Sequence, residues 1–219
     1  SLLPDYAVVD PTLTESLPGR ITAATGLDAF CQAIESIWAV AATDESILYA
    51  TEAARLAFEN LVSATNVPTT EARRAMCRAS HLAGKAINIT KTTAPHALSY
   101  ALTSRYGVPH GMAVAVTLAP MLVFNASVTD KDCSDPRGAL AVRDRIARIL
   151  DILGTDNVGD ACSSISNLLS KVGCPTLEEI DVQGDLMSIV DSVNVQRLAN
   201  NPRRASREQL LEILQHTGS

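Results

Sequence analysis

Apolar residues recur at helical spacing along almost the whole of this 219-residue sequence, and this periodicity restricts the chain to a helical fold. The clearest stripe is made of Leu27, Phe30, Cys31, Ile34 and Trp38. Stripes of the same kind continue to the last run, "SREQLLEIL". Together they predict an all-α bundle of roughly eight to ten helices.

Local signals predict where some of these helices begin. Thr43 suits an N-cap, and Asp44 and Glu45 place negative charge in the first turn of the helix that follows. Residues 109–127, "PHGMAVAVTLAPMLVFNAS", are interpreted as one helix.

One short run departs from the helical pattern. Residues 6–10, "YAVVD", have the composition of a strand, and the sequence offers them no partner strand. We therefore interpret residues 1–13 as an extended segment between domains and residues 14–219 as one helical domain. A chain that begins in this way is expected to follow an N-terminal domain.

The composition argues against two classes of partner and indicates a compartment. A net charge of −6 is unfavourable for binding nucleic acid, which requires a basic surface. No apolar run reaches the roughly 18 residues needed to cross a bilayer, so no membrane partner is expected. The five cysteines are odd in number and contain no CxxC pair, which is typical of reduced thiols in a cytoplasmic protein.

Two of the four histidines, His96 and His110, each follow a proline at a predicted helix start. With Asp28 from an earlier helix they offer one carboxylate and two imidazoles, a donor set that suits a divalent metal such as Fe²⁺ or Zn²⁺. Gln32 lies one turn after Asp28 and could add a carbonyl oxygen. Tyr100 lies one turn after His96 and faces the same point.

The same residues have plainer interpretations. An aspartate near a helix start is commonly a cap or an exposed charge, and single histidines commonly make structural hydrogen bonds. Gln32 would then be a polar residue without a role in binding. No motif such as HExxH is present, so spacing alone leaves both interpretations open.

Five other polar or reactive residues are expected to lie in the core, in a turn or at the terminus, without a role in binding. His81, on an apolar helix, is expected to be a hydrogen-bonded core histidine. His216 is expected in a frayed terminus, and Arg203 and Arg204 in a solvated turn. Cys31 is expected in the core beside the proposed metal site.

Three segments resemble the iron-containing (group III) alcohol dehydrogenases. "DPTLTESLPGRITAATGLDAFCQAIES" is similar to the family's domain-joining segment and first metal helix. "APHALSYALTSRYGVPHGMAVAV" is similar to its second signature, with two histidine ligands, and "NPRRASREQLLEIL" to its closing helix. The resemblance covers essentially the whole chain and implies the helical C-terminal domain of this dehydroquinate synthase-like fold.

The resemblance also assigns roles to individual residues. It implies that Asp28, His96 and His110 are metal ligands. Gln32 stands at the fourth ligand position, where most members have a histidine. Tyr100 stands where many relatives have a histidine that helps to relay the alcohol proton, and a phenol can also donate a proton.

Within the family, "GLDAFCQAIES" together with "INITKTTAPHALSY" resembles the phosphonoacetaldehyde reductase branch, which makes 2-hydroxyethylphosphonate with a nicotinamide cofactor. A physical argument stands beside this resemblance. One cation and three hydroxyls directly before the first signature histidine can hold an anionic phosphonate, and these residues are Thr90, Lys91, Thr92 and Thr93. The alternative is a solvated lysine and threonines that cap the next helix.

The activity implied by the resemblance is hydride transfer from NAD(P)H to an aldehyde, with the metal as Lewis acid and Tyr100 or water as proton source. NAD(P)H is expected to bind mainly to a preceding α/β domain, and a homodimer is a further expectation. Alternatives are glycerol dehydrogenase-like or dehydroquinate synthase-like chemistry, a metal-free binding domain, or a structural bundle for oligomerisation.

Overall fold

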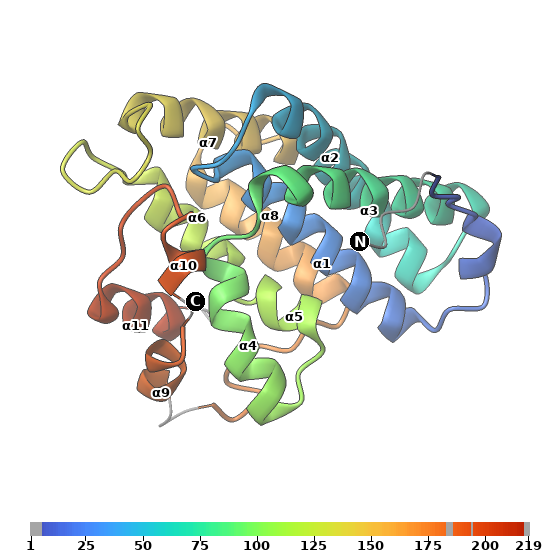
Figure 1. Ribbon diagram of the computed structural model, residues 1–219. Helices are drawn as coiled ribbons and strands as arrows, with labels where there is room; N and C mark the ends of the chain where they lie inside the picture. Colours follow the sequence, from blue (N-terminus) through green and yellow to red (C-terminus); the bar gives the residue numbers. More distant parts are fainter. Residues whose placement is uncertain (1–5, 183–185, 194, 217–219) are drawn as a thin grey trace.

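The computed structural model describes residues 6–182, 186–193 and 195–216 (Figure 1). Within these ranges every regular element is a helix, apart from an isolated antiparallel bridge between Cys133 and Arg203. The all-α prediction is therefore confirmed. None of the described helices combines the length and the apolar character that crossing a membrane requires.

The helices follow one another in a simple order along the chain, beginning with a short 3₁₀-helix. They are η1 (Pro11–Thr14), α1 (Gly19–Trp38), α2 (Asp44–Asn66), α3 (Thr70–Thr90), α4 (Ala94–Tyr106), α5 (His110–Ala115), α6 (Leu118–Ala126), α7 (Ala139–Leu153), α8 (Val158–Lys171), α9 (Leu186–Asp191), α10 (Val195–Leu198) and α11 (Arg207–Gln215).

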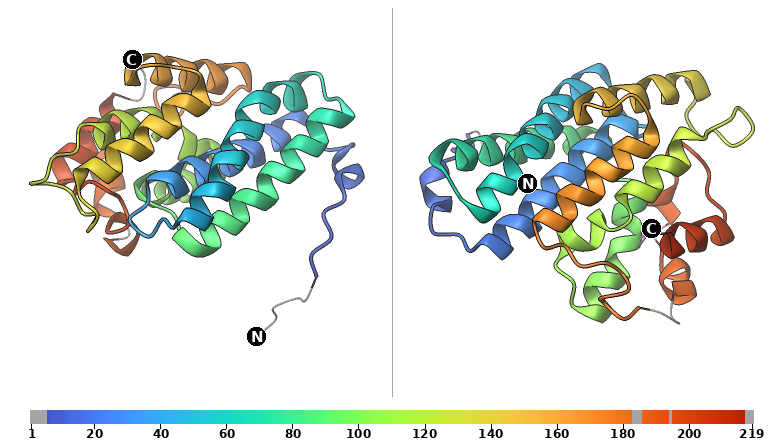
Figure 2. Two further views of the ribbon diagram at one scale, coloured as in Figure 1. Left: turned by 90° about the horizontal axis from the view of Figure 1, so that it is seen from above. Right: turned by 180° about the vertical axis from the view of Figure 1, so that it is seen from behind.

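Helix α1 is the centre of the bundle. It packs against α2 and α3 on one side and against α5 and α7 on others, and the views of Figure 2 show it running between these elements. The predicted apolar stripe is fully buried, and its members are Leu27, Phe30, Cys31, Ile34 and Trp38. Burial of a large apolar side chain contributes roughly 1.5–3 kcal/mol, so this one stripe fixes how α1 is oriented.

The predicted start of α2 is confirmed. The Thr43 hydroxyl accepts a hydrogen bond from Ser46 N at 3.2 Å, and Ser46 Oγ accepts one from Thr43 N at 2.9 Å. This reciprocal capping box satisfies two backbone donors that the helix itself leaves unpaired. Asp44 and Glu45 occupy the first turn, where their charge suits the helix dipole.

The run 109–127 is not one helix, in contrast to the prediction. It forms α5 and α6, which are separated by a turn at residues 116 and 117. Pro120 has no N–H to donate to the carbonyl four residues before it, and its ring crowds that carbonyl. Within the turn, Thr117 Oγ1 donates to Val114 O at 3.2 Å. The break lets α5 end early and gives α6 its own direction.

The segment before α1 is mostly irregular. Residues 6–10 are exposed and have no regular secondary structure, and they run away from the bundle (Figure 2). A 3₁₀-helix starts at Pro11, inside the segment predicted to be extended. It forms because the Asp10 carboxylate accepts from Thr12 N at 3.0 Å and caps the turn. Residues 1–5 lie outside the described ranges.

The expectation for His81 is wrong. His81 is exposed on α3, because the core-facing side of that helix is taken by small residues at Ala79, Ala83 and Ala86. His216 is also exposed at the end of α11, where its Nδ1 lies 2.7 Å from Glu212 O.

Arg203 is not a solvated turn residue. Its Nε donates to Asp132 Oδ2 at 2.8 Å, its Nη1 donates to Phe124 O at 2.7 Å, and its guanidinium lies 4.2 Å from the Phe124 ring centroid. Arg204 is exposed as expected, with Nη1 donating to Cys133 O at 2.8 Å. The two arginines therefore tie the segment before α11 to the loop after α6.

Candidate metal centre

Three side chains from three helices converge on one point. Asp28 from α1, His96 from α4 and His110 from α5 each place one ligand atom within 4.8 Å of the others. Asp28 Oδ1 lies 3.3 Å from His96 Nε2 and 3.8 Å from His110 Nε2. One carboxylate oxygen and two imidazole nitrogens at this separation fit a divalent transition metal.

The close approach of α5 to α1 brings His110 next to Asp28. A Cβ atom added to Gly111 would lie 1.9 Å from Ala24 O and 2.7 Å from Asp28 N. Only a residue without a side chain allows the two backbones to come this near. Gly111 therefore sets the separation between two of the three ligands.

Replacing Gly111 with alanine is expected to lower the free energy of unfolding by about 1–3 kcal/mol or more, because backbone atoms of α1 cannot move aside as a side chain can. Thermal denaturation measures this directly. Gly84→Ala on α3 is the matched control: its Cβ would meet nothing within 4 Å, and helix propensity should raise stability by up to about 1 kcal/mol. Equal stability of Gly111→Ala and the parent would contradict the close-approach argument.

Glu35 belongs to this centre although the sequence analysis did not identify it. It lies on α1 and is completely buried, with Oε1 2.6 Å from His96 Nδ1. Its Oε2 accepts from Thr93 N at 2.5 Å and from Thr93 Oγ1 at 2.9 Å. A carboxylate on Nδ1 fixes the imidazole ring and leaves Nε2 directed toward Asp28. The sequence did contain a signal of this role, because an acidic residue stands inside the apolar stripe, between Ile34 and Trp38.

The two histidines differ in their electrostatic surroundings. Burial lowers the pKa of His96, but Glu35 and Asp28 outweigh burial and raise that pKa to about 9. Burial also lowers the pKa of His110, and Asp28 does not compensate for it. The two carboxylates thus favour a positive charge at His96, whether a proton or a metal ion carries it. These residues therefore fit a bound divalent cation.

Gln32 lies beside the centre and contacts one of the ligands. Its Nε2 donates a hydrogen bond to Asp28 Oδ2 at 2.9 Å. A reversed amide would set two oxygens against each other, so the contact favours this orientation. Gln32 thereby holds the Asp28 carboxylate in place, and its use as a fourth ligand stays a prediction.

Tyr100 lies on the exposed side of the centre. Its ring centroid is 5.8 Å from that of His110, and 43% of the residue is exposed. The guanidinium of Arg197 lies 4.8 Å from the Tyr100 ring centroid, and sequence reasoning had not singled out this arginine. His96, by contrast, is only 3% exposed, so the centre opens toward Tyr100 and His110.

Two of the threonines predicted to bind substrate are buried and already hydrogen-bonded. Thr90 Oγ1 lies 3.0 Å from Ser36 Oγ. Thr93 Oγ1 donates to Glu35 and accepts from Trp38 Nε1 at 2.9 Å. Both hydroxyls therefore stabilise the turn before α4, and Thr93 also holds Glu35, which in turn positions His96.

The other two residues of that turn lie differently. Lys91 is exposed with a positive φ of 61°, which residues other than glycine rarely adopt, and its Nζ donates to Asn88 O at 3.2 Å. Thr92 is buried as well, but its Oγ1 accepts from Arg197 Nη1 at 2.8 Å. Of the four residues predicted to contact the substrate, Thr92 is thus the one hydrogen-bonded to a positively charged side chain beside the centre, that of Arg197.

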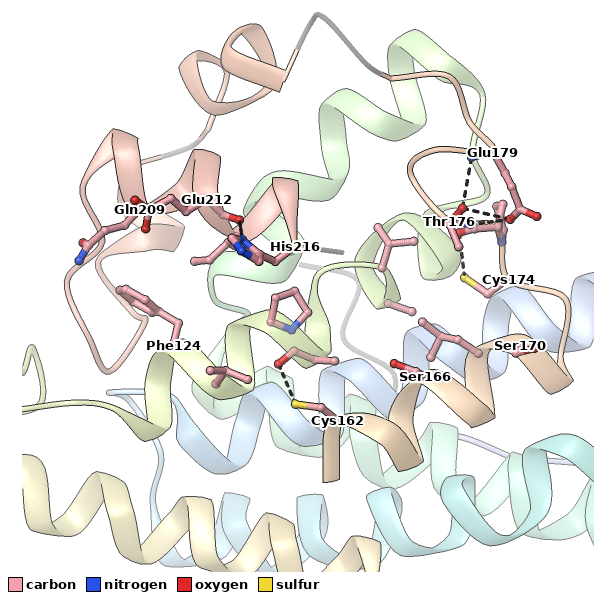
Figure 3. A pocket seen from close by; sticks show the side chains of 18 of the residues that line it. Phe124, Cys162, Ser166, Ser170, Cys174, Thr176, Glu179, Gln209, Glu212 and His216 are labelled. Atoms are coloured by element: carbon pink, nitrogen blue, oxygen red, sulfur yellow. Dashed lines mark hydrogen bonds between the residues drawn. The ribbon is translucent and has the colours of Figure 1, made fainter. Parts of the chain in front are cut away.

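A separate cavity of about 940 Å³ lies between α6, α8 and α11 (Figure 3). None of the three candidate metal ligands lines it. Burial raises the pKa of Cys162, and burial raises the pKa of Cys174 to about 12, so both remain unreactive thiols. The Glu179 carboxylate already accepts a hydrogen bond from Thr176 N at 2.8 Å. The metal centre is therefore the stronger candidate for function.

Comparison with known proteins agrees with this fold. Residues 22–218 match the Fe-containing alcohol dehydrogenase family, C-terminal. Phosphonoacetaldehyde reductase of Streptomyces viridochromogenes is 38% identical over 216 residues, covering 96% of this chain and 53% of the relative. Sulfoacetaldehyde reductase of Bilophila wadsworthia is 34% identical, covering 96% of this chain and 55% of the relative.

Solved structures show the same similarity. Sulfoacetaldehyde reductase from Bifidobacterium kashiwanohense, in complex with NAD⁺, superposes with a TM-score of 0.85 at 32% identity, covering 99% of this chain and 55% of that one. The iron-containing alcohol dehydrogenase from Thermococcus thioreducens gives a TM-score of 0.85 at 26% identity, covering 99% and 56%. The chain thus spans about half the length of these relatives. It belongs to the iron-containing alcohol dehydrogenase family, and it corresponds to the helical C-terminal domain of that family.

Proposed function

We propose that this chain is the metal- and substrate-binding part of an NAD(P)H-dependent aldehyde reductase that acts on a small anionic aldehyde, with phosphonoacetaldehyde as the first candidate. The observation that carries the proposal is the convergence of Asp28, His96 and His110 within 4.8 Å. Similarity to phosphonoacetaldehyde reductase supports the substrate class. Sulfoacetaldehyde, another anionic aldehyde, is the second candidate because two relatives act on it.

A divalent ion, Fe²⁺ or Zn²⁺, held by the three ligands would supply Lewis acidity at the aldehyde oxygen. The chain's own residues then have distinct tasks. Glu35 fixes the His96 ring, and Gln32 fixes the Asp28 carboxylate. Tyr100 would donate the proton that the product alcohol needs, a role supported by its position beside His110 and its exposure at the surface.

The cofactor would bind mainly to an N-terminal α/β domain of the same polypeptide, with the reaction in the cleft between the two domains. The NAD⁺ complex of a structural relative and the share of that relative covered here support this division. All five cysteines are free thiols, which supports a cytoplasmic location. Assembly as a homodimer stays a prediction.

Metal loading tests the proposal. The parent chain, loaded anaerobically with Fe(II) or Zn(II), is expected to hold about one ion per chain by elemental analysis. Gln32→His should raise metal affinity about tenfold or more, because imidazole is a better transition-metal ligand than an amide oxygen. Failure of a folded parent and of folded Gln32→His to bind either ion would contradict the proposal.

A further inference from the structure

The geometry points to Arg197 as the residue that binds the anionic group of the substrate and so determines the preference for anionic aldehydes. This inference rests on the proposed function and adds a specificity-determining residue to it. The sequence analysis had assigned the positive charge to Lys91 instead.

Arg197 contacts the residues that stand four positions before and four positions after His96. Its Nη1 donates to Thr92 Oγ1 at 2.8 Å, and its guanidinium lies 4.8 Å from the Tyr100 ring centroid. The Tyr100 ring in turn lies 5.8 Å from that of His110. The positive charge is therefore held between the turn before α4 and Tyr100 on α4, and the Tyr100 ring lies beside the metal ligand His110.

The segment that carries Arg197 is anchored to the turn before α4. Helix α10, Val195–Leu198, packs against α4. Two residues beyond it, Asn200 Nδ2 donates to Thr90 O at 2.8 Å and to Thr92 O at 3.0 Å. A guanidinium fixed at its base and at its tip loses little further freedom when it binds a ligand, which favours affinity.

Lys91 is a weaker candidate for the same task. It is exposed, and its Nζ donates back to Asn88 O on α3 at 3.2 Å. That contact belongs to its own helix end and joins it to no residue of the metal centre. An ammonium group also lacks the planar fork that matches two oxygens of one phosphonate or sulfonate.

The chemistry of the substrate agrees with this position. A single methylene separates the carbonyl carbon from the phosphonate or sulfonate, so the anionic group must lie close to the metal ligands when the carbonyl does. The Arg197 guanidinium lies over the Tyr100 ring, 4.8 Å from its centroid, and its planar fork of N–H donors matches two oxygens of one phosphonate or sulfonate. Charge-assisted N–H···O bonds from such a fork are among the stronger contacts available to a phosphonate.

Steady-state kinetics of the complete enzyme, with this chain joined to its cofactor domain, test the inference. Arg197→Gln is expected to raise KM for phosphonoacetaldehyde about 10- to 100-fold and to leave kcat/KM for propanal within about threefold of the parent. Arg197→Lys should restore part of the loss, because it keeps the charge without the fork. Lys91→Gln is the matched control and should leave KM and kcat/KM unchanged for both substrates.

The outcomes separate the inference from the function on which it rests. An equal loss of kcat/KM for both substrates would mean that Arg197 only holds Thr92 and Tyr100 in position, and would overturn the inference. A phosphonoacetaldehyde-specific loss in Lys91→Gln, absent from the Arg197 variants, would overturn it as well. A parent enzyme without preference for anionic aldehydes would overturn the proposed substrate class itself. If Arg197→Gln does not fold, Arg197→Lys is used in its place. The quantity compared is then kcat/KM for phosphonoacetaldehyde divided by kcat/KM for propanal, and a value equal to that of the parent overturns the inference.

Discussion

Replacing His96 with alanine is expected to lower metal affinity about 100- to 1000-fold, the largest effect of any single change considered for this chain. His96 supplies one of the three converging ligand atoms, and its ring is the one most firmly held. The change also leaves Glu35 buried without its imidazole partner. Removing one member of a buried pair costs about 3–5 kcal/mol of stability, so the variant must be checked for folding by circular dichroism.

Two further variants make the result decisive. His96→Gln keeps a group that can donate a hydrogen bond to Glu35, so it should fold better than His96→Ala while binding metal as poorly. His81→Ala removes an exposed histidine from α3 and should leave metal content and stability unchanged. Parent-like metal content in folded His96→Gln, measured by elemental analysis, would show that the ion is held elsewhere.

Replacing Glu35 with glutamine is expected to lower metal affinity about 10- to 100-fold and stability by about 1–3 kcal/mol. The carboxylate accepts hydrogen bonds from His96 Nδ1 and from Thr93 N through its two oxygens. An amide offers one oxygen and one NH₂ group, so one of these donors would face another donor. The imidazole would also lose the negative partner that makes it a stronger ligand.

Calorimetric titration with Zn(II) and thermal denaturation measure the two effects of Glu35→Gln separately. Glu52→Gln is the control: Glu52 pairs with Arg78 at 2.5 Å on the surface, where such pairs contribute about 0.5 kcal/mol or less. If Glu35→Gln lowers stability but leaves metal affinity unchanged, Glu35 serves the fold and not the centre.

The sequence predicted best what depends on neighbouring residues. The stripe from Leu27 to Trp38 is buried as predicted, and Thr43 caps α2. Both follow from rules that act within one or two helical turns. His96 and His110 came into consideration because each follows a proline at a predicted helix start, whereas Asp28, in the middle of α1, was put forward for its carboxylate and for the family resemblance.

Features set by packing between distant segments escaped prediction. Glu35 is charged, and its burial depends on the turn at residues 90–93 folding over it. Arg197 comes 101 positions after His96, and no local pattern connects the two. Lys91 drew attention because it is near His96 in the chain, yet its side chain bonds to its own helix end. Proximity in sequence was a poor guide to which cation faces the centre.

The chain contains a single tryptophan, and its place in the hydrogen-bond network makes it an intrinsic optical reporter. Trp38 is fully buried, and its indole N–H donates to Thr93, which donates to Glu35, which holds His96. A charge arriving at His96 therefore acts on the indole through three consecutive hydrogen bonds. We therefore expect metal binding at the centre to change the emission of Trp38, with no label attached.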